Sequence, residues 1–477
     1  MERELLILAA VFLAAAFSSC SGERGRGTGN AGPSGAGYLA AERHKSPESD
    51  VFLRIKREVD AIRLVDTHEH LITEKFWLTQ EPDFFWWFQQ PWFPQYSGAD
   101  LVSAGLPEDD LQFIIDKKNP LVERWERVAP YWPVIKFTGF GQALRIAARD
   151  IYGIPDIDEN TWQELSKRIA ESKKAGFYNK VLHDMAGIDL VILDQIVLAD
   201  PFLSGGPPER TVMVKRFDYT FIELNREVVD SISKEYGMSI KNLDDLLAAL
   251  DKAFQELVSK GYYVGLKCAQ AYDRVIYYEN VPKAQAEKLF AEIFKRDLTR
   301  EERKPLEDFM LHQVAERAGR YDLPFQIHTG IQAGPGNVVT NSKPTHLLNL
   351  FQQYPRTKFV LFHGSFPYMG ELTVLAKNYP NVYLDMCWLP IISPTVTKEW
   401  LHKWLETVPV NKIMAFGGDY QFPEGTYAHS VIARQVVAET LAEKVEAGYL
   451  TEEEAVWIAR RLLRENAIEL FRLERFL

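Results

Sequence analysis

From about Val51 onward, short apolar runs typical of β-strands alternate with longer amphipathic stretches typical of helices. This alternation predicts a parallel sheet, and eight repeats of it predict an α/β fold of the (β/α)8 TIM barrel type. A doubly wound open sheet is the competing architecture. The predicted strands are Leu64–His68, Asp189–Leu193, Thr211–Lys215, Tyr263–Lys267, Pro324–His328, Lys358–His363, Val382–Met386 and Lys412–Phe416.

Capping residues indicate where the helices begin and end. The stretch NLDDLLAALDKAFQELVSKG begins at Asn242 or Leu243, and Gly261 ends it, because glycine readily adopts the left-handed backbone that closes a helix. A second helix is predicted from Pro305 in PLEDFMLHQVAERAGRYD, and a third in HLLNLFQQYPR. From Glu399 to the end the sequence is mostly helical and is expected to close the barrel.

A large aromatic-rich insertion, about residues 72–180, separates the first two predicted strands. It contains FFWWFQQPWFPQY, which is aromatic enough to form a lid or pocket wall over the barrel. The alternative is a small helical subdomain whose aromatic side chains fill only its own core. The two interpretations agree if the subdomain leans over the barrel mouth.

Residues 1–20 have the pattern of an export signal, with an apolar run from Leu5 to Phe17 that ends at SSC. This resembles the bacterial lipoprotein signal, in which Cys20 would carry the lipid; an ordinary cleaved signal peptide is the alternative. Residues 21–50 are rich in Gly, Ser and Pro and predict a flexible tether. We therefore expect the folded part, 51–477, to be exported and held on a bacterial membrane, facing the periplasm or the exterior.

Composition excludes several classes of function. The net charge of -11 and the isoelectric point near 5.6 argue against a nucleic-acid binder, because phosphate contacts need a basic face. The sequence contains no P-loop and no paired Cys-x-x-Cys motif. Cys268 and Cys387 lie in strand-like runs, so we expect buried free thiols rather than a disulfide. The expected partner is a small-molecule substrate, and homo-oligomer formation stays open.

Polar residues with metal-binding or acid–base chemistry stand at the carboxyl ends of five predicted strands. A barrel of this kind places its active site at these ends, so the side chains are expected to converge. Alone, each has a simpler explanation, such as a loop histidine or a helix cap, but the joint pattern predicts one metal site. The residues are His68 and His70 in DTHEH, Lys267 in GLKC, His328 in IHTG, His363 in FHG and Asp419 in GGDYQF.

These motifs resemble the metal-dependent amidohydrolase superfamily, and especially its amidohydrolase-related branch. The carboxyl-terminal half is also similar to amidohydrolase-like domains fused to glutamine synthetase-like enzymes, and more distantly to uronate isomerases. The resemblance covers about Val51 to the end, without much of the aromatic insertion.

The resemblance implies that a divalent metal, such as zinc, is held by His68, His70, His328 and Asp419. Binuclear members add a carboxylated lysine, and here Lys267, His328 and His363 occupy the corresponding places. We therefore expect one tightly held ion, with a second conditional on carboxylation of Lys267. An ordinary lysine that pairs with a substrate carboxylate is the alternative.

The expected reaction is hydrolysis of an amide, lactone or related carbonyl bond of a small molecule. Asp419 is the candidate general base, and His363 is the candidate group that polarises the carbonyl. Tyr272, Arg274 and His429 are the candidate substrate contacts. A sugar-acid isomerase or decarboxylase on the same scaffold is the alternative enzyme, and a non-catalytic metal-binding lipoprotein is the alternative from another class.

The anchor prediction can be tested by fractionation. In a bacterial host the chain should partition with membranes, and Cys20→Ala should release it or leave its precursor uncut, because the lipid-carrying residue is gone. A full-length product in the cytoplasm would reject the export hypothesis.

Overall fold

The computed structural model describes residues 49–90, 93–94, 96–194 and 206–477, and Asp50–Leu477 form one compact unit. The predicted signal, Cys20 and the tether lie outside the described residues. Within the described part, no helix is both long and apolar enough to cross a bilayer.

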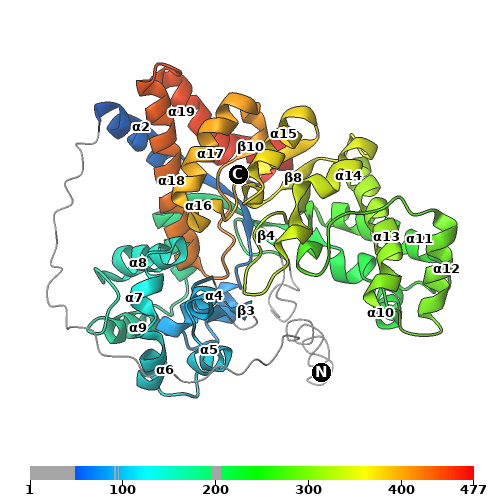
Figure 1. Cartoon of the computed structure of the whole chain (residues 1–477), viewed down its shortest axis with the longest axis horizontal. Helices are drawn as coiled ribbons and strands as arrows, with labels where there is room; N and C mark the ends of the chain where they lie inside the picture. Colours follow the sequence, from blue (N-terminus) through cyan, green and yellow to red (C-terminus); the bar gives the residue numbers. More distant parts are fainter. Residues whose placement is uncertain (1–48, 91–92, 95, 195–205) are drawn as a thin grey trace. The chain divides into compact units, whose positions relative to one another are not determined.

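Eight parallel strands form one sheet at the centre of this unit (Figure 1). The strand order β1-β4-β5-β6-β7-β8-β9-β10 follows the chain without a reversal, so the (β/α)8 barrel is confirmed and the doubly wound sheet is excluded. Every predicted strand is present. The bounds are β1 Leu64–Glu69, β4 Ile188–Asp194, β5 Thr211–Arg216, β6 Tyr263–Cys268, β7 Phe325–Ile327, β8 Phe359–Leu361, β9 Val382–Asp385 and β10 Ile413–Met414.

The first and last strands are joined by hydrogen bonds beyond the end of β10 rather than by a regular ladder. The backbone N–H and the hydroxyl of Thr67 both donate to the carbonyl of Phe416, at 3.3 and 3.0 Å. The N–H of Asp419 donates to the carbonyl of His68 at 2.9 Å. The barrel is therefore closed next to the predicted metal ligands.

Helices cover the outside of the sheet, and their apolar faces form a continuous core with it. Asn242 caps α11 by accepting a hydrogen bond from the N–H of Asp245, and Gly261 ends the helix with φ 76°, as predicted. The longer outer helices and those that follow β9 and β10 are α2 Asp50–Ala61, α10 Arg226–Tyr236, α11 Leu243–Lys260, α12 Lys283–Ile293, α13 Arg300–Tyr321, α14 Leu348–Gln353, α15 Met369–Asn378, α16 Leu389–Ile392, α17 Pro394–Thr407, α18 Pro423–Glu446, α19 Glu452–Arg460 and α20 Asn466–Phe471.

Helix α13 begins five residues before Pro305, where the sequence predicted its start. The side chain of Thr299 accepts from the N–H of Glu302, and the Glu302 carboxylate accepts from the N–H of Thr299. This capping box fixes the start of the helix more strongly than a proline at its first position would.

The insertion between β1 and β4 is helical, as predicted, with a short hairpin. Its aromatic side chains share one core with residues in or next to the barrel strands, such as Val65, Val214 and Phe362. The insertion therefore does not keep a separate core. Its elements are α3 Glu74–Trp77, η1 Phe84–Trp87, β2 Gln89–Gln90, β3 Phe93–Pro94, α4 Tyr96–Ser103, α5 Glu108–Ile115, α6 Leu121–Val128, α7 Trp132–Ile135, α8 Gly139–Tyr152, α9 Trp162–Glu171 and η2 Asn179–Met185.

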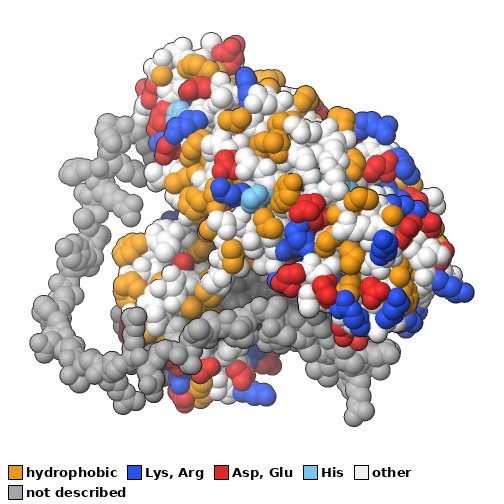
Figure 2. All heavy atoms as spheres, turned by 45° about the vertical axis from the view of Figure 1, so that its right-hand side comes forward, with side chains coloured by type: hydrophobic (Ala, Val, Ile, Leu, Met, Phe, Trp, Pro, Cys, Tyr) orange, Lys and Arg blue, Asp and Glu red, His pale blue; other side chains and the backbone are white. Residues whose placement is uncertain are grey.

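The insertion packs on the segments that follow β9 and β10, with α8 against α16 and α18 (Figure 1). Trp87 stacks on Phe422, with ring centroids 6.3 Å apart, and Tyr96 packs on Trp388 at 4.6 Å. It thus covers part of the face on which the strands end. On the face shown in Figure 2, acidic and basic side chains are interspersed rather than separated by sign.

Candidate metal centre

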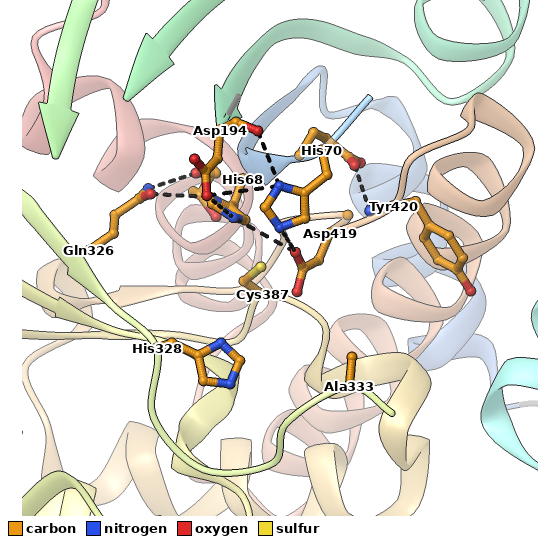
Figure 3. A network of polar contacts seen from close by, with 12 residues as sticks. His68, His70, Asp194, Gln326, His328, Ala333, Cys387, Asp419 and Tyr420 are labelled. Carbon is orange, nitrogen blue, oxygen red and sulfur yellow. Dashed lines mark hydrogen bonds and ion pairs between the residues drawn. The ribbon is translucent and has the colours of Figure 1, made fainter. Parts of the chain in front are cut away.

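The structure brings the six predicted site residues together at the carboxyl ends of the strands, and Figure 3 shows His68, His70, His328 and Asp419 of this set. Five of them are buried and the sixth, His70, is partly exposed. They are His68, His70, Lys267, His328, His363 and Asp419.

Asp419 is held in place by two carboxyl groups of β1. Asp66 accepts from the N–H groups of His68 and Gly418, at 3.1 and 3.0 Å, and Glu69 accepts from the N–H of Tyr420 at 2.7 Å. A Cβ at Gly418 would lie 1.7 Å from a Glu69 oxygen, so only glycine allows this approach. These contacts fix the loop that carries Asp419 against the strand that carries the histidines.

Four non-glycine residues at this face have left-handed backbones. The φ angles are 60° at His363, 55° at Ser365, 65° at Trp388 and 60° at Asp419. Such conformations are unfavourable for L-residues and persist where the surroundings enforce them, often at functional sites.

The hydrogen bonds of the two histidines of β1 assign their ring protons. The Nδ1–H of His68 donates to Gln326 Oε1 at 3.1 Å, and the amide nitrogen of Gln326 donates to the carbonyl of Thr67, which fixes the amide orientation. The Nδ1–H of His70 donates to the carbonyl of Asp194 at 3.1 Å. Since each neutral imidazole carries one ring proton, both Nε2 atoms are left as lone-pair donors.

Both Nε2 atoms face Asp419 Oδ1, at 3.7 Å from His68 and 3.1 Å from His70 (Figure 3). The Nε2 of His68 is buried and has no hydrogen-bond partner among the described residues. Ligand atoms about 2.0–2.1 Å from a tetrahedral Zn²⁺ lie about 3.3 Å apart. The two separations from Asp419 Oδ1 are close to this value, so the carboxylate and the two imidazoles fit a divalent cation of zinc's size.

His328 and His363 form a second pair of ring nitrogens. The Nδ1 of His328 lies 3.1 Å from Nε2 of His363, while their other nitrogens face the carbonyls of Ile331 and Cys387 at 2.8 and 2.9 Å. These three contacts need three protons, and two neutral rings carry two. Burial lowers the pKa of His363 to about 4 and that of His328 well below its usual range, so a third proton is disfavoured. Because the carbonyl oxygens only accept, the two protons go to them, and Nδ1 of His328 and Nε2 of His363 are left as two facing lone pairs that can bind a cation.

The electrostatics keep Asp419 ionised. Burial raises its pKa, but the hydrogen bond and charge of His70, together with the charges of His68 and His363, outweigh this and hold the pKa well below its usual range. For Lys267, burial lowers the pKa to about 8, while the charges of Asp194 and Asp419 act in the opposite direction. Its ammonium lies 3.6 Å from the centre of the Phe362 ring.

An ion pair that the sequence did not indicate borders the cluster. Arg216 Nε donates to both oxygens of Asp194, at 2.9 and 2.8 Å. Asp194 Oδ2 lies 3.6 Å from His68 Nε2, and His68, His70 and Asp194 offer ligand atoms within 4.8 Å of one another. Burial raises the pKa of Asp194, but the charge of Arg216 outweighs it, so a carboxylate stands beside the histidines.

Of the predicted substrate contacts, Tyr272 lies at the rim of the site, whereas Arg274 does not reach it. Tyr272 is 38% exposed and its ring lies 4.7 Å from that of His328, so it stands at the rim of the site. Arg274 points away from the cluster, because its guanidinium pairs with Glu307, at 2.9 Å, and with Asp308.

His429, the third predicted substrate contact, is fully buried behind the Asp419 loop. Its Nδ1–H donates to the carbonyl of Gly418 at 3.0 Å, and its ring packs edge-on against Phe416. The structure therefore places His429 behind the loop, where it supports the backbone beside Asp419.

Sequence reasoning missed Asp194, Arg216 and Cys387, although each ends or follows a predicted strand. His363, Cys387 and Asp419 also offer ligand atoms within 4.8 Å of one another. All three lie at the carboxyl ends of strands, so an inspection of all eight strand ends, rather than five, identifies them. Both remaining thiols, Cys268 and Cys387, are buried and free, as predicted.

The family model described as "Amidohydrolase" matches residues 223–473, more than half of the chain. The chain belongs to the amidohydrolase family. Membership supports a metal-dependent, hydrolase-type activity, and the fold and the candidate ligand groups agree with it.

One curated relative of this amidohydrolase-family chain is protein fluG of Emericella nidulans, 33% identical over 180 residues. The match covers 36% of this chain and 21% of the relative, so it spans about a fifth of that protein's length.

Solved structures share the fold. Uronate isomerase from Thermotoga maritima has a TM-score of 0.73 and 19% identity over 88% of this chain and 97% of its own. Glucuronate isomerase from Caulobacter crescentus has a TM-score of 0.74 and 18% identity over 91% and 97%. A protein named provisionally as a metal-dependent hydrolase, from Lactobacillus casei, has a TM-score of 0.60 and 18% identity over 89% and 98%.

Removal of either histidine of β1 tests the ligand assignment. His68→Ala and His70→Ala should each lower metal affinity by at least the roughly 10–100-fold that loss of an outer-shell partner costs, with the barrel still folded. Metal content after dialysis, with circular dichroism as the folding check, measures this.

The matched control for these variants is His402→Ala, since His402 pairs with Glu443 on the outer helices. Full metal content in both β1 variants would contradict the assignment.

Proposed function

We propose that this protein is a metal-dependent hydrolase that cleaves an amide, lactone or related carbonyl bond of a small molecule. The observation that carries the proposal is the convergence of His68 Nε2, His70 Nε2 and Asp419 Oδ1, three buried or partly buried atoms that all offer lone pairs when each histidine carries its proton on Nδ1. These three residues would hold a divalent cation, zinc in our proposal, which would lower the pKa of a bound water to about 7 and polarise a carbonyl.

Asp419 has the geometry to move the proton. Its Oδ1 faces the histidines of β1, while Oδ2 lies on the other side, 3.9 Å from Nδ1 of His363. Oδ2 can take a proton from the attacking water and return it to the leaving group. We propose that His363, whose Nδ1 lies against the carbonyl of Cys387, polarises the substrate oxygen; for this its proton moves from Nδ1 to Nε2.

Positive charge near the cluster favours a substrate with an anionic group. Lys267 is buried beside the ligands, and Arg216 stands behind Asp194. Tyr272 at the rim can contact the same substrate. A second ion remains conditional on carboxylation of Lys267, whose lowered pKa makes the neutral amine required for that reaction more accessible.

The experiment that tests the reaction class is a substrate screen with the zinc-loaded protein, followed by identification of products formed in ¹⁸O-labelled water. One added oxygen per cleaved bond supports hydrolysis. A product that is an isomer of its substrate, without added water, would contradict hydrolysis and support a sugar-acid isomerase on the same scaffold.

Asp419→Asn separates proton transfer from metal binding. The amide keeps the size of the side chain and one oxygen for the cation but cannot accept a proton, so turnover should fall by roughly 10²–10⁴ while metal is at least partly retained. Steady-state rates and metal content are measured together, and Asp230→Asn on the exposed face of α10 is the control.

The wild-type rate should rise with pH to a plateau, because the attacking water must lose its proton and Asp419 is already ionised. Wild-type turnover by Asp419→Asn would sink the mechanism.

A further inference from the structure

Cys387 follows β9 and stands beside the catalytic carboxylate. Its sulfur points toward Asp419 in Figure 3, and His363, Cys387 and Asp419 offer ligand atoms within 4.8 Å of one another. All three side chains are buried. Histidine, thiolate and carboxylate are the ligands that zinc-like cations take in proteins, at about 2.0–2.3 Å.

The two buried thiols of the barrel differ in their surroundings. The sulfur of Cys268 lies 3.7 Å from the hydroxyl of Tyr278, a hydrogen-bond contact. The sulfur of Cys387 has no such contact with the described residues, and the backbone of Cys387 is fixed by its N–H, which donates to Asp385 at 2.8 Å. The backbone therefore fixes the position of the Cys387 thiol, while its sulfur makes no hydrogen bond with the described residues.

The neighbouring loop leaves space for this sulfur. A Cβ at Gly417 would lie 2.9 Å from Cβ and 3.0 Å from Sγ of Cys387, closer than packed atoms allow. Glycine at 417 therefore keeps the thiol next to the loop that carries Asp419.

We infer that Cys387, His363 and Asp419 form a second cation position, which takes a thiophilic divalent ion such as Zn²⁺. The inference rests on the proposed metal centre and adds a thiolate ligand to it. As the sulfur–metal bond forms, the thiol releases its proton to solvent, and the thiolate adds its negative charge to that of Asp419.

An ion bound at this second position would affect the proposed reaction through Asp419. Asp419 would be held through Oδ1 on the side of His68 and His70 and through Oδ2 on the side of His363. Since Oδ2 is the oxygen that the proposed mechanism uses for the proton, filling the second position inhibits turnover. The first ion activates, and the second inhibits.

Titration of the metal-free full chain with Co²⁺ tests the inference through absorption. The first equivalent should give visible d–d bands without a sulfur-to-cobalt charge-transfer band. The second should add that near-ultraviolet band, because only this position contains a thiolate. Cys387→Ser should lose the charge-transfer band and the second equivalent but keep the first.

Cys268→Ser is the matched control, a buried thiol of the same barrel, and it should keep both equivalents and the band. The inference is overturned if wild type binds Co²⁺ without a charge-transfer band, or if Cys387→Ser retains the band. Absence of any cobalt bands, in wild type as in the variants, would overturn the proposed metal centre itself.

Discussion

The junction between β1 and the loop after β10 determines the site. Asp66 and Glu69 accept hydrogen bonds from the backbone of that loop, and Asp419 donates to the carbonyl of His68. This junction both closes the barrel and sets the carboxylate against two imidazoles. Gly418 is essential to it, because a side chain there would collide with Glu69. Closure of the fold and assembly of the metal centre are therefore the same set of contacts.

Around this junction, the outward nitrogens of the histidines are committed to oxygens of the barrel. Gln326 and the carbonyl of Asp194 fix the two rings of β1, so their inward nitrogens are lone pairs that face a carboxylate. Nitrogen lone pairs that face a carboxylate in a buried site destabilise the folded state unless a cation or a proton lies between them. Burial lowers the pKa of His68 and of His363, which disfavours an additional proton on these rings and favours a metal cation instead.

Much of this could be predicted from the sequence, because strand and helix periodicities are local and polar residues at strand ends converge by topology. His68, His70, His328 and Asp419 follow from that rule. Arg274 does not, because its partners lie on α13, some thirty residues away, and sequence distance does not reveal them. His429 faces the back of a loop, a direction that its helix position alone leaves open.

The proposed reaction depends on where the protein binds a metal ion. Anomalous diffraction from crystals of the zinc-loaded protein, collected at the zinc absorption edge, measures this directly. We predict a peak about 2.0–2.2 Å from Nε2 of His68, Nε2 of His70 and Oδ1 of Asp419. A peak bound elsewhere, or none at this cluster after zinc loading, would contradict the account.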